Sequence, residues 1–325
     1  MYATTVFGET SRSFARCSRK SATSASDDGA LIYDEPDLRA TDAVWYSRDG
    51  RPTGTAFSQA GRVIFSDISA RGEMVLMAAG TPTGMTVTSV RLADGAQTRV
   101  IREERIPRYV SWSPGDGRFV TTVFEKGDGV VISMDPTGGA ERRVLSLTHH
   151  WMANTSVGPD GTIVFDDPFS GRFTDILYLP QGTGTETKPY LATAADEQNG
   201  KLSPDGRLVA YASDASGRDE IYVDAFAGRL GPVRVSADGA SALSARWRGD
   251  GRELYFRSAD GRTLMACDVT PSLAAGRPRA LFTLPPEAID FLPAPDGSKF
   301  LVFVPVGEPR TSLTLVQNWS AQLAK

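Results

Sequence analysis

A sevenfold repeat runs through this chain of 325 residues. The turn sequence Ser-Pro-Asp-Gly-Arg at residues 203–207 recurs in degenerate form, and successive turn glycines are 43, 45, 44, 45, 45 and 46 residues apart. These glycines are Gly29, Gly72, Gly117, Gly161, Gly206, Gly251 and Gly297. A period in the forties is typical of one β-propeller blade, which needs four short antiparallel strands and their turns. The repeat therefore predicts an all-β, seven-bladed propeller of four-stranded antiparallel blades, with six blades as the alternative.

The repeated turn is of the kind that joins two strands of a hairpin. Proline presets φ at the second turn position, aspartate bonds its own backbone two residues on, and glycine accepts a positive φ. Apolar runs rich in β-branched and aromatic residues follow each turn and predict the second and third strands of each blade. The predicted second strands are residues 30–33, 74–77, 119–124, 163–165, 208–212, 254–256 and 300–304. The predicted third strands are residues 43–46, 87–92, 130–134, 176–179, 220–223, 264–269 and 313–316.

The seventh unit has no fourth strand of its own after residues 313–316. An unpaired strand edge invites pairing with another chain, so a ring needs a strand from elsewhere. The N-terminal residues 3–7 are strand-like, and we expect them to pair with residues 313–316 and close the ring. The alternative is a disordered N-terminal leader with six full blades and one partial blade. The predicted domains are a tail at 1–23, a single propeller of seven repeats at 24–320, and a tail at 321–325.

Composition agrees with a globular chain and excludes some partners. The net charge of −4 and the isoelectric point near 5.4 disfavour nucleic acid, because phosphate contacts need a basic face. No apolar run approaches the roughly 20 residues of a membrane span, and residues 1–23 show no apolar centre of a secretory signal. The two cysteines, Cys17 and Cys267, are too few for a disulfide framework, and Cys267 reads as a buried thiol. We expect a monomer.

The repeat sequences resemble those of a known family. The stretch LSPDGRLVAYAS at 202–213, followed by SGRDEIYV at 216–223, resembles the repeat of TolB-like propellers. Units five to seven, with RWRGDGRELYFR at 246–257 and LVQNW at 315–319, are similar to the propeller of bacterial eukaryotic-type serine/threonine kinases. The resemblance covers about residues 24–320, although units one, two and four depart from its pattern.

The resemblance implies an extracytoplasmic, periplasmic binding or scaffold module, although a fold of this kind also hosts enzymes. The kinase motifs themselves are missing: the sequence has no glycine-rich phosphate loop before a Val-Ala-Ile-Lys strand and no His-Arg-Asp sequence. We therefore expect no phosphoryl transfer.

Motifs for other chemistry are also missing from the sequence. There is no Gly-x-Ser-x-Gly elbow, His-Glu-x-x-His sequence or paired Cys-x-x-Cys. His149 and His150 are the two histidines of the chain, which leaves little material for a triad or a multi-histidine metal site. No segment reproduces a calcium loop closed by glutamate, so we expect no cofactor, with calcium as the alternative.

The connections that enter the first strand of each blade ring one mouth of the central channel, so their side chains are the candidate site. The predicted ligand-binding residues are Arg108, Tyr109, His150, Trp151, Glu197, Gln198 and Asp290. Adjacent residues of an extended chain point to opposite faces, so at most one of the two histidines faces the channel. Trp112 and Trp247 hold the same place in their units, which indicates packing between blades.

Two functions of different class remain open. The first is a non-enzymatic module that recognises a protein or small polar ligand at the channel mouth. The second is a channel-mouth hydrolase, of esterase or lactonase type, or a lyase. That enzyme would use His149 or His150 with Asp196 or Glu197 as its acid or base partner.

Overall fold

The computed structural model describes residues 24–25, 30–34, 37–81, 84–102, 105–115, 117–125, 128–147, 153–168, 174–181, 186–228, 230–308 and 313–317. Across these ranges every regular element is a β-strand, as the sequence predicts. None of them forms a helix with the length and apolar character that crossing a membrane requires.

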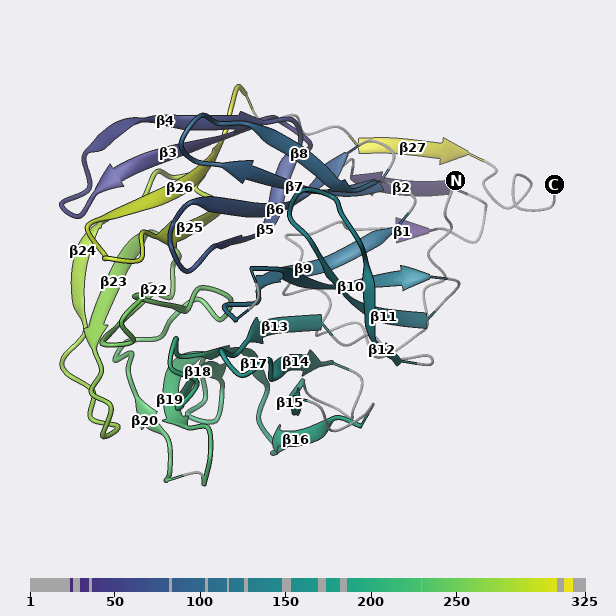
Figure 1. The fold of residues 1–325 in the computed structure, drawn as a ribbon. Helices are drawn as coiled ribbons and strands as arrows, with labels where there is room; N and C mark the ends of the chain where they lie inside the picture. The colour runs from purple at the N-terminus through teal and green to yellow at the C-terminus, as the bar shows by residue number, and fades with distance from the viewer. Residues whose placement is uncertain are drawn as a thin grey trace. The chain divides into compact units, whose positions relative to one another are not determined.

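Six four-stranded antiparallel sheets form a propeller ring within residues 40–306 of the described chain. In Figure 1 the first strands β13 (Ala153–Val157) and β17 (Glu197–Leu202) lie inward. The fourth strands β16 (Lys188–Leu191) and β20 (Val233–Arg234) lie at the periphery. The ring axis is therefore surrounded by first strands, which is where the structure places the site described below.

The sheets are numbered as blades in ring order. The remaining first strands are β5 (Arg62–Ile68), β9 (Ile106–Trp112), β21 (Arg246–Trp247) and β25 (Asp290–Pro293). The second strands are β6 (Met74–Thr81), β10 (Phe119–Glu125), β14 (Ile163–Asp167), β18 (Leu208–Ser213), β22 (Glu253–Arg257) and β26 (Lys299–Pro305). The third strands are β7 (Gly84–Arg91), β11 (Asp128–Met134), β15 (Asp175–Leu179), β19 (Glu220–Ala225), β23 (Thr263–Asp268) and β3 (Thr41–Ser47). The other fourth strands are β8 (Gln97–Ile101), β12 (Arg142–Leu147), β24 (Arg279–Thr283) and β4 (Pro52–Gln59).

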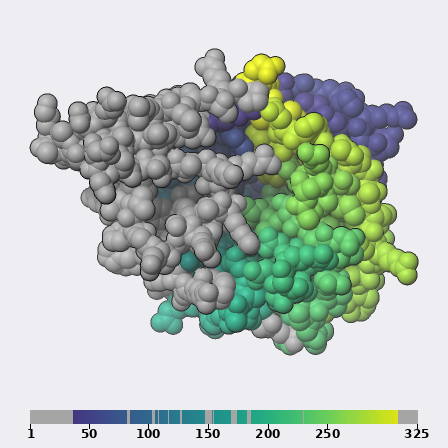
Figure 2. All heavy atoms as spheres, turned by 180° about the vertical axis from the view of Figure 1, so that it is seen from behind, coloured from purple at the N-terminus to yellow at the C-terminus, as the bar shows by residue number. Residues whose placement is uncertain are grey.

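The sixth blade combines the two ends of the ring unit. Its sheet has the order β25-β26-β3-β4, and Leu301 of β26 lies opposite Trp45 of β3. In Figure 2 the yellow-green surface of the C-terminal strands lies against the purple surface of residues near 50. The first and seventh sequence repeats each contribute half of this blade. The described ring therefore has six blades, the alternative named above, and the preferred number of seven is wrong.

The strands outside the ring form a separate three-stranded sheet of order β1-β2-β27, made of Ser24–Ala25, Ala30–Asp34 and Leu313–Gln317. In this sheet Leu315 lies opposite Ile32. The predicted partner of the last strand, residues 3–7, lies outside the described residues. Among the described strands β27 pairs with β2, and the pairing of residues 3–7 with residues 313–316 to close the ring stays a prediction. The predicted domain bounds remain a prediction.

Each blade interface in the described ring has its own apolar cluster. One cluster joins the first and second blades through Leu76, Val87, Trp112 and Phe119, all of them buried. Another joins the sixth and first blades through Phe303 and its neighbours. Sheets that bury both faces against neighbouring sheets gain most of their stability from this packing, at roughly 25 cal/mol per Å² of apolar area.

The repeated turns have the geometry that their sequence predicts. In the turn at 203–207, the amide of Gly206 donates to the carbonyl of Ser203 at 2.8 Å, and Gly206 has φ of +73°. The Asp205 carboxylate accepts from the Ser203 hydroxyl at 2.6 Å and from the Arg207 amide at 3.1 Å. These bonds hold the first and second strands in register, and so fix which first-strand residues face the axis.

Candidate functional site

One repeat position places polar residues on the first strands that surround the ring axis. It is the residue two before the turn, and we call it the axis position. In the six blades its occupants are Asp67, Ser111, Ser156, Lys201, Arg246 and Leu292. Their pairing partners on the second strands are Leu76, Val120, Val164, Ala210, Tyr255 and Leu301. Equivalent places in equivalent sheets point their side chains alike, so both signs of charge and two hydroxyls share one layer.

Lys201 is a partly buried cation of this layer. Its ammonium donates to the carbonyl of Thr155 on the neighbouring third blade. Burial, and then the positive charge of Arg246, lower the pKa of Lys201 to about 8, which the carboxylates of Asp67, Asp166 and Asp290 partly oppose. Lowered pKa values of this kind are common at functional sites.

Asp67 supplies a carboxylate at the axis position of the first blade. It accepts the amide of Trp112 at 2.8 Å and the amide of Ile68 at 2.9 Å. Burial raises the pKa of Asp67, while Lys201 and then the Trp112 amide act in the opposite direction. An ionised carboxylate at this place is costly unless a positive group lies near it.

Arg246 and Asp290 form the ion pair of the layer. One nitrogen of Arg246 lies 3.2 Å from each carboxylate oxygen of Asp290, and both side chains are 13% exposed. Ser66 donates its hydroxyl to the same carboxylate at 2.7 Å. Asp290 is a residue that the sequence analysis predicted for the site, and the structure places it beside the axis position.

Ser111 brings a hydroxyl that has no hydrogen-bond partner among the described residues. The serine is 2% exposed. It occupies the axis position of the second blade, between Asp67 and Ser156 in ring order. Ser156, by contrast, accepts the amide of Leu202 at 3.1 Å. A buried orphan hydroxyl indicates a partner that the protein does not supply, such as water or a ligand.

A β-bulge in β17 places a further carboxylate beside Lys201. Asn199 has φ of +58°, and its amide donates to both oxygens of Asp166 at 2.9 Å. The register of β17 against β18 shifts between Gln198 and Lys201, which marks the bulge. Burial raises the pKa of Asp166 to about 7, against the Asn199 amide and Lys201.

Tyr109 occupies the corresponding bulge of β9, with φ of +54°. Its ring packs on Phe65, with ring centroids 4.0 Å apart. Non-glycine residues with positive φ are uncommon and concentrate where the chain must re-aim a side chain. Both bulged residues thus lie on first strands, whereas the sequence predicted the site in the connections that enter these strands.

The other predicted residues do not occupy the axis position. Glu197 is buried and accepts the hydroxyl of Thr193, while burial raises its pKa against that hydrogen bond. Asp196 accepts the amide of Thr174 at 2.9 Å. Gln198 precedes the bulge, and of Arg108 only its place in β9 is described. His149, His150 and Trp151 lie outside the described residues.

The charged axis residues were missed by the sequence analysis, which considered the entry loops. A signal was nevertheless present, because Asp67, Lys201 and Arg246 all stand two residues before a repeated turn. Aligning the six units on that turn shows charged residues where an inward strand would normally carry small or apolar ones. The predicted packing role of the tryptophans is confirmed. Trp247 donates its indole N–H to the Lys201 carbonyl at 2.9 Å, and Trp112 donates to that of Asp67 at 3.3 Å.

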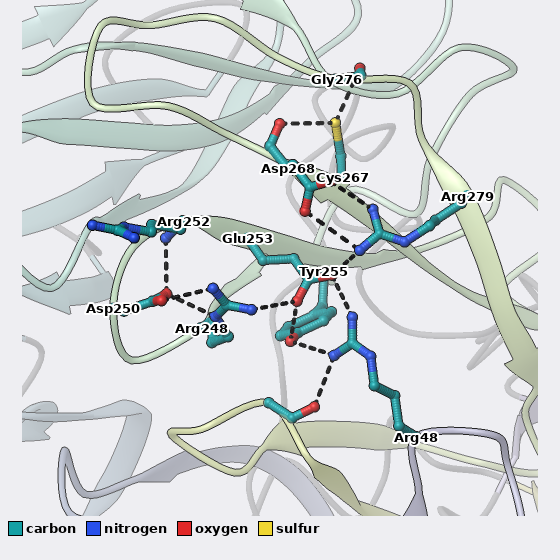
Figure 3. A network of polar contacts seen from close by, with 11 residues as sticks. Arg48, Arg248, Asp250, Arg252, Glu253, Tyr255, Cys267, Asp268, Gly276 and Arg279 are labelled. Carbon is teal, nitrogen blue, oxygen red and sulfur yellow. Dashed lines mark hydrogen bonds and ion pairs between the residues drawn. The ribbon is translucent and has the colours of Figure 1, made fainter.

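A second polar network joins the fifth and sixth blades away from the axis position (Figure 3). The fully buried Glu253 carboxylate lies 2.5 Å from Arg48 and 3.2 Å from Arg248, and it also pairs with Arg279. The Tyr255 hydroxyl donates to it at 2.7 Å, and burial together with this bond raises the pKa of Tyr255 to about 12. Because Arg48 comes from the sixth blade and the others from the fifth, this network links two blades.

The described part of the chain offers no cluster of metal ligands. There, no group of three or more histidine, cysteine, aspartate or glutamate side chains is placed to hold a metal ion. Asp67 and Asp290 each interact with protein groups instead.

Comparisons with known proteins agree with the geometry of the fold. A putative TolB from Agrobacterium tumefaciens is 18% identical, with a TM-score of 0.65, and the match covers 84% of this chain and 100% of that one. TolB from Acinetobacter baumannii is 14% identical with a TM-score of 0.57, over 86% of this chain and 67% of that one. A chain of a nidogen/laminin complex is 10% identical with a TM-score of 0.56, over 86% and 99%. No protein-family model and no curated protein sequence matches.

The chain is therefore a β-propeller protein. Its fold is TolB-like, as the repeat sequences predicted. At these identities the likeness defines the fold alone, and the function has to be argued from the residues at the axis.

Proposed function

We propose that this protein is a non-enzymatic binding module that takes a polar ligand at the axis of its propeller ring. The observation that carries the proposal is the pair Lys201 and Asp67. These are partly buried groups of opposite charge, contributed by different blades at the same repeat position, and the hydrogen bonds that they form in the described chain are to backbone groups. Enclosed charges are costly to keep unless something pairs with them. A ligand with polar groups would supply that pairing.

The proposal places the ligand deeper than the channel mouth that the sequence analysis favoured. Asp290 belongs to both descriptions, Tyr109 and Gln198 would line the approach, and a ligand contact of Arg108 stays a prediction from the sequence. We further propose that the protein acts as an extracytoplasmic monomer, in keeping with the resemblance to TolB-like propellers. A protein partner would contact the same face through an inserted polar group.

The test is a screen of polar metabolites by thermal shift, using the wild type, Lys201→Met and Asp67→Asn. A ligand of the axis raises the Tm of the wild type and leaves both variants unmoved. Lys188→Met, which removes an exposed lysine from the fourth strand β16, serves as the matched control and keeps the wild-type response. Equal shifts in the wild type and both axis variants would place binding elsewhere and contradict the proposal.

A turnover assay on the same purified protein tests the hydrolase alternative. Turnover of short-chain esters or lactones that disappears in a variant with both His149→Ala and His150→Ala would contradict a non-enzymatic role. Asp196 and Glu197, the other members of that alternative, bond to Thr174 and Thr193 in the described structure. His149 and His150 lie outside the described residues, so the turnover assay is the test of this alternative.

A further inference from the structure

The residues at the axis position are mostly polar, and their charges are also sorted around the ring. From the proposed binding function and this arrangement, we infer that the ligand is a small zwitterion of the amino-acid class. Its carboxylate would bind Lys201, and its ammonium group would bind Asp67. The ring order of the axis position supports this: Asp67 and Ser111 lie on the first and second blades, and Lys201 and Arg246 on the fourth and fifth.

Lys201 has unused capacity for an anion. Among the described residues its ammonium contacts the Thr155 carbonyl, and no carboxylate lies within ion-pair distance of it. An ammonium has three donors, so two remain for a ligand. The neighbouring cation, Arg246, is already held by Asp290. A ligand carboxylate beside Lys201 would therefore gain a charge-assisted hydrogen bond without breaking an existing ion pair.

Asp67 has the complementary capacity for a cation. Its carboxylate accepts two backbone amides, and no lysine or arginine of the described chain forms an ion pair with it. Two carboxylate oxygens offer about four acceptor sites. A ligand ammonium would occupy the free ones and stabilise the ionised carboxylate, which burial disfavours.

Ser111 provides the third contact. Its orphan hydroxyl lies at the axis position of the blade next to Asp67, and β5 and β9 are neighbouring first strands. A hydroxyl can accept a hydrogen bond from a ligand ammonium while the same ammonium donates to Asp67. The orphan is thus explained by the same ligand that pairs the two charges.

A ligand with only one charge would leave one of the two protein charges unpaired, so the ligand needs both charges. An anion would pair Lys201 but leave the enclosed Asp67 carboxylate without a positive partner. A cation would do the reverse. The Asp67 carboxylate reaches the Trp112 amide on β9, and the Lys201 ammonium reaches the Thr155 carbonyl on β13. Because β9 and β13 are neighbouring first strands, one small molecule can reach both charges. Arg246 and Asp290 form an ion pair with each other, so neither needs the ligand as a partner, although both also act on the pKa of Lys201.

The experiment measures binding of each proteinogenic L-amino acid to the wild type by calorimetry and thermal shift. The tightest binder is then compared with its amide, which lacks the anion, and its N-acetyl derivative, which lacks the cation. We expect each derivative to bind at least about tenfold more weakly, the loss of one charge-assisted hydrogen bond. Lys201→Met should reduce the affinity for the amino acid but not for the amide. Asp67→Asn should reduce it for the amino acid but not for the N-acetyl derivative.

The Ser111→Ala variant tests whether Ser111 has a binding role or a structural one. It also keeps the proposal testable if the charge variants misfold. Because its hydroxyl has no protein partner, its removal should leave the Tm of the free protein unchanged or higher. It should also weaken amino-acid binding several-fold. A lower Tm with unchanged affinity would overturn the assignment of Ser111. Binding of the N-acetyl derivative or the amide as tight as the amino acid would overturn the zwitterion. The zwitterion would also be overturned if no amino acid binds the wild type while another polar ligand does, and the axis variants lose that ligand. In that case the proposed function would stand.

Discussion

At the residue scale, burial changes the behaviour of individual titratable groups around the axis. Asp166 shows this most clearly, because its carboxylate caps two consecutive amides of the bulge in β17 while burial raises its pKa to about 7. The sequence around it, Phe-Asp-Asp, reads as an ordinary acidic turn. Its environment is made by Asn199 and Lys201, which are more than 30 residues away along the chain.

The raised pKa of Asp166 predicts a pH dependence of stability. The folded pKa of about 7 exceeds the unfolded value of 3.8, so the folded state holds the proton more tightly between these values. The stability contributed by this group is therefore full below that window and is lost as the pH rises through it. Asp166→Asn lacks this loss, so its Tm relative to the wild type should be a few degrees higher at about pH 8 than at about pH 5.

The control for this measurement is Asp260→Asn. The Asp260 carboxylate is exposed, and a hydrogen bond from Ser258 lowers its pKa, so it stays ionised in both states across the same range. Its effect on Tm should be the same at both pH values. A Tm difference for Asp166→Asn that is likewise independent of pH would show that Asp166 does not titrate in this window.

At the element scale, neighbouring blades are joined by side chains that reach across the interface. Trp112 and Trp247 repeat one such bond, and the Glu253 network supplies another between the fifth and sixth blades (Figure 3). The tryptophan contacts could be predicted, because the two residues share a repeat position. The Glu253 network could not, because Arg48 reaches it from the turn after β3, which belongs to the first repeat in sequence.

Glu253 should therefore be a stability determinant. Glu253→Gln removes the buried charge that neutralises Arg48, Arg248 and Arg279, and we expect a loss of about 3 kcal/mol in the free energy of unfolding. Denaturant unfolding measures this loss. Asp268→Asn, which breaks the exposed contact of the same Arg279, should cost less than about 1 kcal/mol. Equal losses in the two variants would contradict the role given to the buried carboxylate.

At the scale of the whole molecule, the ring unit depends on strands from both ends of its sequence. β25 and β26 would form a two-stranded sheet without β3 and β4, and the edge of β26 would then be unpaired. Unpaired edges of apolar strands promote association between chains. The two halves of the sixth blade thus hold together residues 40–306.

A pair of shortened chains tests this dependence. Residues 40–306 contain all six described blades and should fold with a Tm within a few degrees of the full chain. Residues 61–306 lack β3 and β4 and should unfold or aggregate. Circular dichroism and light scattering distinguish the two results. A well-folded shorter chain, or failure of the 40–306 chain to fold, would contradict the assignment of the sixth blade.

The sequence by itself determined the propeller, because a turn glycine every 43 to 46 residues and the apolar runs between turns depend on local chemistry. It also predicted Asp290, which pairs with Arg246 of the axis position, although the site itself stays a prediction. The blade number, the partner of the last strand and the arrangement of Asp67, Ser111 and Lys201 on first strands around one axis were decided by the tertiary structure alone. Each of these depends on which distant strands become neighbours, and the same strand sequence can pair with more than one edge until the packing of the whole ring selects one.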